Sequence, residues 1–134
     1  MTPTIRQTIR LLLADDQALV RGALASLLGL EPDLEVVAEV GRGDDVVPAA
    51  REARPDVALL DVEMPGLDGI AATQKLKEDP RTQHLPILIL TGYPMRGIAE
   101  GALEAGADAF ITKPCLPEDL EHHVLRLIDR SADA

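Results

Sequence analysis

Short apolar runs that each end at a polar residue constrain the fold of this chain more than any other feature. The polar residues are Asp15 and Asp16, Asp61, Thr91 and Lys113, which follow residues 9–14, 57–60, 87–90 and 109–112. Runs of this length and composition are typical of buried strands in a parallel sheet. Ligands of open α/β sheets bind outside the carboxyl ends of the strands. The sequence therefore predicts that three carboxylates, one hydroxyl and one ammonium group meet at one edge of a sheet.

Helical patterns alternate with these runs, and residues 34–40 predict one further strand. Helices are expected at 17–30, 44–54, before 78, at 95–105 and from Pro117, with Gly106 as a C-cap. The first helix is expected to bury Val20, Leu24, Leu27 and Leu28, and the last helix Leu120, Val124, Leu127 and Ile128. Five β-α units with right-handed crossovers predict a single (βα)5 doubly wound parallel sheet. Strand order 2-1-3-4-5 follows by analogy with the flavodoxin-like arrangement.

Length and composition indicate one globular domain with an aliphatic core. The chain has 134 residues and is 46% hydrophobic, with Tyr93 and Phe110 as its aromatic residues. We expect a domain over 9–129, a loose lead-in over 1–8 and a polar tail over 130–134. A net charge of −10 disfavours direct binding of nucleic acid by this chain. Neither a transmembrane stretch nor a signal peptide is evident, so the expected location is cytoplasmic.

The predicted cluster of polar groups has the chemistry of a metal-dependent phosphoryl acceptor. Asp15, Asp16 and Asp61 bring like charges together, and a hard divalent cation such as Mg²⁺ would neutralise them. An aspartate such as Asp61 can act as a nucleophile and form an aspartyl-phosphate. The hydroxyl of Thr91 and the ammonium of Lys113 can stabilise the transferred oxygens.

On these residues the chain resembles the receiver domain (CheY-like) of two-component response regulators. The matching segments are Ala14–Gln17, Leu60–Gly69, Leu90–Gly92 and Phe110–Pro114. The resemblance covers about residues 9–128, and it implies a phospho-accepting regulatory domain rather than a true enzyme. It also implies a sensor histidine kinase as phosphodonor.

The resemblance implies a role for each site residue. Asp61 would be the phospho-acceptor, with Thr91 and Lys113 holding the phosphoryl group. The Mg²⁺ site would comprise Asp16 as a direct ligand, Asp15 mainly through bound water, Asp61 and the main-chain carbonyl of Glu63. Thr91 and Phe110 would form the switch, although Phe110 could equally be a core aromatic. Pro114 would follow a cis peptide bond. The output surface, through which a homodimer could form, would combine the fourth helix, fifth strand and fifth helix.

Finer motifs resemble the NarL/LuxR-type transcription regulators, which carry a C-terminal helix-turn-helix domain. They are Leu19–Leu24, Glu31–Glu39 and Glu104–Ala107. The chain departs from that subgroup at Lys113-Pro114 and in residues 79–86. The protein could thus be a complete single-domain regulator or the regulatory half of a DNA-binding protein.

Three other interpretations of these residues are possible. Asp15 and Asp16 could merely cap a helix. A phosphatase of the haloacid-dehalogenase kind would place a second aspartate two residues after the nucleophile, where this chain has Glu63. A receiver-like interaction module could work without phosphate, but it would not need the intact set of site residues.

Overall fold

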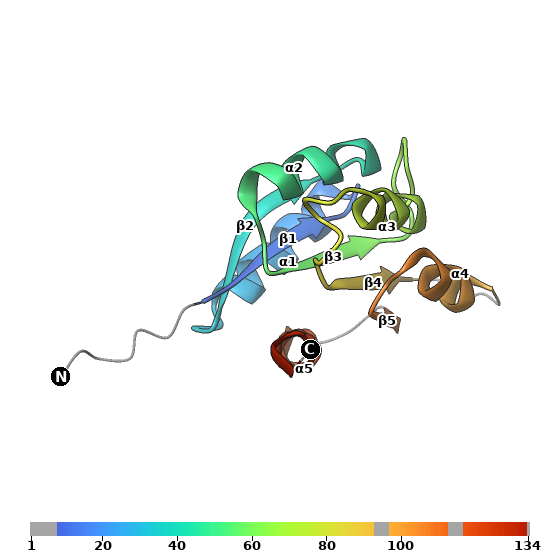
Figure 1. The fold of residues 1–134 in the computed structure, drawn as a ribbon. Coiled ribbons are helices and arrows are strands. Elements are labelled where there is room, and N and C mark those ends of the chain that lie inside the picture. Colours follow the sequence, from blue (N-terminus) through green and yellow to red (C-terminus); the bar gives the residue numbers. More distant parts are fainter. Residues whose placement is uncertain (1–7, 93–96, 113–116, 134) are drawn as a thin grey trace.

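The computed structural model describes residues 8–92, 97–112 and 117–133. Strands and helices alternate along the chain (Figure 1). The strands are β1 (Ile9–Ala14), β2 (Leu34–Val40), β3 (Val57–Asp61), β4 (Ile87–Thr91) and β5 (Ala109–Thr112). The helices are α1 (Ala18–Gly29), the 3₁₀ turn η1 (Gly43–Asp45), α2 (Val46–Ala53), α3 (Gly69–Glu78), α4 (Ile98–Ala105) and α5 (Pro117–Asp133). The predicted strands agree with these bounds to within one residue.

The strands form one parallel sheet in the order β2-β1-β3-β4-β5, which confirms the predicted topology. Asp61 lies opposite Leu90 across β3 and β4, and Thr91 lies opposite Thr112 across β4 and β5. Because all strands run in one direction, their carboxyl ends share one edge of the sheet. The polar residues after the apolar runs are therefore brought to that edge.

Both faces of the sheet are covered, which explains why the central strands are apolar at successive positions. On one face, Leu12, Leu60 and Ile89 pack with residues of α2, α3 and α4. On the other face, Leu13, Leu59 and Leu88 pack with residues of α1 and α5. Adjacent residues of a strand point to opposite faces, so each central strand contributes to both cores.

Helix α1 buries only part of the predicted face. Leu28 is fully buried and Leu24 packs against the α1–α5 core. Val20 and Leu27, which were also expected in the core, are 40% and 45% exposed, so that part of the prediction is wrong. The helix packs on the sheet through Leu24 and Leu28, whereas Val20 in its first turn and Leu27 on the adjacent side remain at the surface. Helix α5 buries Leu120, Val124 and Leu127 as predicted, with Ile128 packed alongside.

The observed ends of the helices show where local sequence signals predicted a helix end correctly and where they did not. Gly106 caps α4 in the left-handed conformation, as predicted, and its N–H donates to Ala102 and Leu103. The predicted helix at 44–54 is instead the turn η1 followed by α2, which ends at Arg54 with φ 51°. The helical backbone of α5 continues to Asp133, through most of the segment expected as a polar tail. None of the helices in the described residues is long and apolar enough to cross a bilayer.

Candidate functional site

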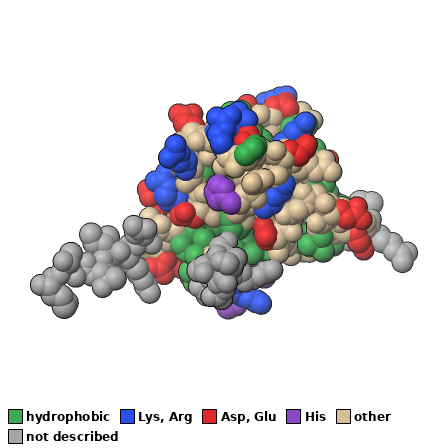
Figure 2. All heavy atoms as spheres, in the orientation of Figure 1, with side chains coloured by type: hydrophobic (Ala, Val, Ile, Leu, Met, Phe, Trp, Pro, Cys, Tyr) green, Lys and Arg blue, Asp and Glu red, His purple; other side chains and the backbone are tan. Residues whose placement is uncertain are grey.

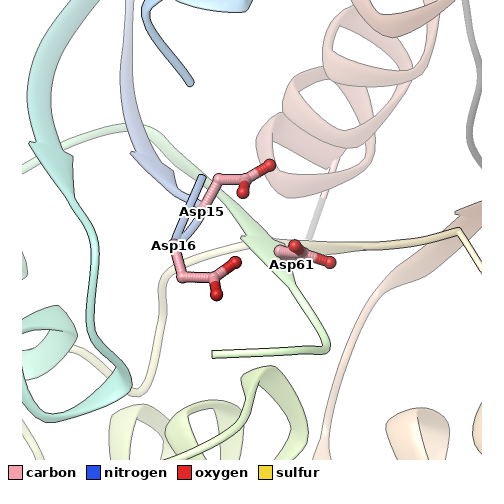
Figure 3. Close-up of side chains that lie close together, drawn as sticks. All are labelled: Asp15, Asp16 and Asp61. Atoms are coloured by element: carbon pink, nitrogen blue, oxygen red, sulfur yellow. The ribbon is translucent and has the colours of Figure 1, made fainter. Parts of the chain in front are cut away.

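Three carboxylates converge at the carboxyl edge of the sheet (Figure 3). Asp15 and Asp16 follow β1 and Asp61 ends β3, and one oxygen from each lies within 4.8 Å of the others. Asp15 and Asp61 are buried, at 2% and 6% exposure, whereas Asp16 is exposed. The sequence predicted this cluster, and the structure brings the three residues together.

Hydrogen bonds of the β1–α1 loop fix the backbone of Asp15. Its N–H donates to the carbonyl of Val40 at 3.1 Å, which continues the β1–β2 ladder past the end of β1. Its carboxylate oxygen Oδ1 accepts the N–H of Gln17 at 2.9 Å, just before α1 begins. The Asp15 carboxylate therefore orders the turn before α1, and it also belongs to the acidic cluster.

Arg21 is a structural neighbour of the site that the sequence did not reveal. Its Nη1 donates to the main-chain oxygen of Asp15 at 2.6 Å, and its Nε lies 3.6 Å from the carboxylate of Glu39. Gly41 leaves room for the guanidinium, because a Cβ there would lie 2.9 Å from Nη1. Arg21 thus links α1 to the loop that carries Asp15 and Asp16. A lone arginine on a helix gives no sequence signal of such a contact.

The loop after Asp61 is closed by main-chain contacts. The N–H of Val62 donates to Leu90 at 3.0 Å, and the N–H of Gly69 donates to Val62 at 2.8 Å. A Cβ at position 69 would collide with the main-chain oxygen of Asp61, so glycine is required for this close approach. Asp68 then caps α3 by accepting the N–H of Ala71 at 2.7 Å. The N–H of Glu63 faces Oδ1 of Asp61 at 3.5 Å, and the Glu63 side chain is exposed.

The remaining predicted site residues divide into described and undescribed ones. Thr91 ends β4 and is fully buried, one position beyond the residue that pairs with Asp61. Phe110 is partly buried and packs against the core on the α2–α3–α4 side. Lys113 and Pro114, including the expected cis bond, lie outside the described residues, as do Tyr93 and Cys115.

This geometry determines what the site can do chemically. Three carboxylates held close together repel one another, and two of them are shielded from water by burial. A small divalent cation that prefers oxygen ligands and retains water molecules would offset this repulsion. The donor set therefore suits Mg²⁺ or a similar hard cation. A buried hydroxyl from Thr91 on the adjacent strand adds a hydrogen-bond donor to the same edge.

The chain belongs to the response regulator receiver domain family, whose model matches residues 11–125. Receivers of this kind are phospho-accepting regulatory modules of two-component systems rather than true enzymes. The match agrees with the fold and with the acidic cluster, and it removes the phosphatase alternative.

Individual relatives include regulators with different outputs. The transcriptional regulatory protein DesR of Bacillus subtilis is 36% identical over 116 residues, which are 87% of this chain and 56% of DesR. A protein-glutamate methylesterase/protein-glutamine glutaminase of Halalkalibacterium halodurans is 41% identical over 132 residues, 94% of this chain and 37% of that protein. The chain thus spans about half or less of these relatives.

Solved structures give the same result for the receiver itself. A LuxR-family two-component response regulator from Aurantimonas sp. SI85-9A1 superposes with a TM-score of 0.84 at 31% identity. The superposition covers 92% of this chain and 86% of that one. Similarity to a LuxR-family receiver agrees with the expected subgroup.

Proposed function

We propose that Asp61 accepts a phosphoryl group in a Mg²⁺-dependent reaction and that its phosphorylation switches an output surface. The observation that carries this proposal is the convergence of Asp15, Asp16 and Asp61 within 4.8 Å at the carboxyl edge of the sheet. Asp61 is the acceptor because it lies on the central strand β3, between the Asp15–Asp16 pair and Thr91 of β4.

Asp15, Asp16, Asp61 and the carbonyl of Glu63 are the proposed ligands of the cation. Bound Mg²⁺ would supply the positive charge that offsets the carboxylates and the incoming phosphoryl oxygens. In the reaction, a carboxylate oxygen of Asp61 bonds to phosphorus as the donor's P–N or P–O bond breaks. The leaving group takes up a proton from solvent. Thr91 would donate its hydroxyl to one phosphoryl oxygen and Lys113 its ammonium to another.

Intact-mass measurement after incubation with acetyl phosphate tests this assignment. Wild type should gain one phosphoryl adduct when Mg²⁺ is present and none when it is chelated. Asp61→Asn should gain none. Asp68→Asn is the matched control, since asparagine caps a helix as well as aspartate and should leave the adduct unchanged. An adduct on Asp61→Asn would overturn the acceptor assignment.

The proposed phosphodonor in the cell is a sensor histidine kinase, and α1 offers it a contact surface beside the site. Helix α1 begins two residues after Asp16 and leaves large apolar side chains exposed. Leu19, Val20, Leu27 and Leu30 are 88%, 40%, 45% and 77% exposed. Their helical spacing places them along one side of α1. A partner covering this row would exclude water next to the acceptor.

Comparing two phosphodonors tests the role of this apolar row. In Leu19→Ser/Leu27→Ser, transfer from the cognate histidine kinase should slow about tenfold, the effect of losing roughly 1.4 kcal/mol of contact energy. Labelling by acetyl phosphate should be unchanged, because the small donor needs no such contact. Leu103→Ser on α4, where Leu103 is 58% exposed, serves as the control. Equal slowing with both donors would remove α1 from the kinase interface.

The proposed switch passes from Thr91 to Phe110 and on to the surface formed by α4, β5 and α5. Phosphorylation would shift an existing equilibrium between two arrangements of this surface, and a homodimer could form through it. Control of transcription in the cytoplasm is the proposed output, because DesR is a transcriptional regulatory protein and this chain aligns with 56% of it. Sedimentation of the phosphorylated and unmodified protein tests the dimer, and a DNA-binding domain in the full-length protein would support the output.

A further inference from the structure

A cavity of about 440 Å³ lies near the amino edge of the sheet, away from the acidic site. Its walls come from the end of α2, the segment between α2 and β3 and the segment between α3 and β4. Its polar lining consists of Arg51, Arg54, Asp56, Arg81, Thr82 and His84, and its apolar lining of Ala50, Pro55 and Leu85. The volume is within the range of small-molecule sites, which are typically a few hundred Å³.

The carboxylates near this cavity are held by groups of the protein. Asp56 accepts the N–H of Arg10 at 2.8 Å. Asp79 accepts Arg51 Nε at 2.7 Å and the N–H of Arg81 at 2.8 Å, and its carboxylate lies 3.7 Å from Nε of Arg81. Within the part of the chain that the structure describes, the guanidinium of Arg54 forms neither a hydrogen bond nor an ion pair with the protein. The guanidinium of Arg54 therefore remains available to a ligand, whereas those of Arg51 and Arg81 are paired with Asp79.

The backbone of Arg54 gives a second, independent indication. Arg54 has φ 51° and ψ 60° and caps α2 with its N–H on the carbonyl of Ala50 at 3.0 Å. It is the one residue other than glycine with positive φ among the described residues. Glycine would adopt this conformation without strain. Residues in sparsely populated backbone conformations cluster at functional sites, and here such a residue lines the cavity.

The local charge contrasts with the whole molecule. The chain has a net charge of −10, yet three arginines and a histidine line this one cavity with a single aspartate. In the view of Figure 2, Lys and Arg side chains lie among Asp and Glu side chains over the upper part of the molecule. Guanidinium groups bind phosphate and carboxylate oxygens in paired, charge-assisted hydrogen bonds. The partly enclosed, partly apolar shape suits a compact molecule rather than an extended chain.

We propose that this cavity binds a small organic anion, with its phosphate or carboxylate group on Arg54 and its carbon skeleton within the cavity. The binding would occur at the amino edge and would not require phosphorylation of the acidic site. The receiver would then respond to a metabolite as well as to its kinase.

Heteronuclear NMR titration of the full chain tests the proposal. The probes are AMP, citrate and inorganic phosphate, each at millimolar concentration, constant ionic strength and without divalent cations. AMP or citrate should shift amide signals of residues 50–56 and 81–85 in a saturable way. Inorganic phosphate reports on the anion group alone and should bind more weakly at the same residues.

Arg54→Gly separates binding from stability. It should weaken the binding of AMP or citrate about tenfold, as expected for loss of one charged hydrogen-bonding group. Its thermal midpoint should equal or exceed that of wild type, because glycine relieves the positive φ. Arg126→Ala, an exposed arginine on α5, is the control and should bind as wild type does. Unsaturable shifts, equal binding by Arg54→Gly, or binding of an acidic peptide with none of the small anions would overturn the proposal.

Discussion

Aspartates at the two edges of the sheet have contrasting surroundings. At the amino edge, Asp79 is surrounded by donors, accepting from Arg51 and from the N–H of Arg81. These contacts, the N–H of Arg81 foremost and then Arg51, lower the pKa of Asp79 below its ordinary value of 3.8. At the carboxyl edge, Asp15, Asp16 and Asp61 face one another within 4.8 Å.

The difference shows how one residue type serves structure in one place and chemistry in another. The Asp79 cluster ties α2 to the segment before β4, and its charges offset each other within the protein. The acidic site instead brings three carboxylates together, and a bound cation would offset the repulsion among them. Stability at the amino edge should therefore depend on pH, and stability at the carboxyl edge should depend on metal.

The largest expected effect comes from disturbing the close main-chain contact between Gly69 and Asp61. In Gly69→Ala, the new methyl group would collide with the main-chain oxygen of Asp61, and rearrangement of this kind costs roughly 1–3 kcal/mol. Urea unfolding should show that loss, and acetyl phosphate labelling should fall with it. Gly22→Ala is the control, because a Cβ at Gly22 in α1 meets no atom within 4 Å. Wild-type stability in Gly69→Ala would show that this close approach is not required.

Added Mg²⁺ should stabilise the protein through the acidic cluster and not through the Asp79 contacts. At a concentration one hundred times its dissociation constant, a ligand of the native state stabilises by about 2.7 kcal/mol. Mg²⁺ should therefore raise the thermal midpoint of wild type and of Asp79→Asn by similar amounts. Asp16→Asn should lose most of the increase, because it removes a proposed ligand. An unchanged increase in Asp16→Asn would place the cation elsewhere.

Lowering the pH tests the amino edge. Because the pKa of Asp79 is lowered in the folded state, its stabilising effect is complete well above pH 3.8 and is lost as the pH falls through the lowered pKa. Asp79→Asn should therefore be several degrees less stable than wild type at pH 7, and the two should converge in strong acid. Thermal unfolding across this range measures the difference. A gap that stays constant with pH would mean that the Asp79 contacts act through shape rather than charge.

The smallest effect is expected at Glu121 on α5. Partial burial, followed by the nearby charges of Glu31 and Asp33, raises the pKa of this carboxyl. A raised pKa in the folded state means that stability falls as the pH rises through it. Glu121→Gln should therefore stabilise the protein slightly at pH 7, by about 0.5 kcal/mol or less. The gain should disappear at low pH, and Glu118→Gln, an exposed residue of the same helix, should show no such gain.

Much of the fold and of the acidic site could be predicted, because local patterns carry the information. Continuous apolar runs define the strands, and Gly106 marks the end of α4 through its backbone freedom. Asp15, Asp16, Asp61 and Thr91 end strands that point the same way, so parallel topology alone brings them to one edge. The order of the strands came from analogy, since hydrophobic periodicity does not distinguish one parallel order from another.

Sequence by itself thus determined the strands, the edge at which the acidic residues meet and the receiver-type chemistry available there. Only the tertiary structure decided which row of α1 is buried, how Arg21 reaches the carbonyl of Asp15, and that Arg51 and Arg81 enclose Asp79. The physical reason is packing. Strand and cap signals act through the local backbone, whereas the Arg51–Asp79 pair joins residues 28 apart and the burial of α1 depends on how the helix lies on the sheet. The partners of these residues are set by the packing of helices on the sheet.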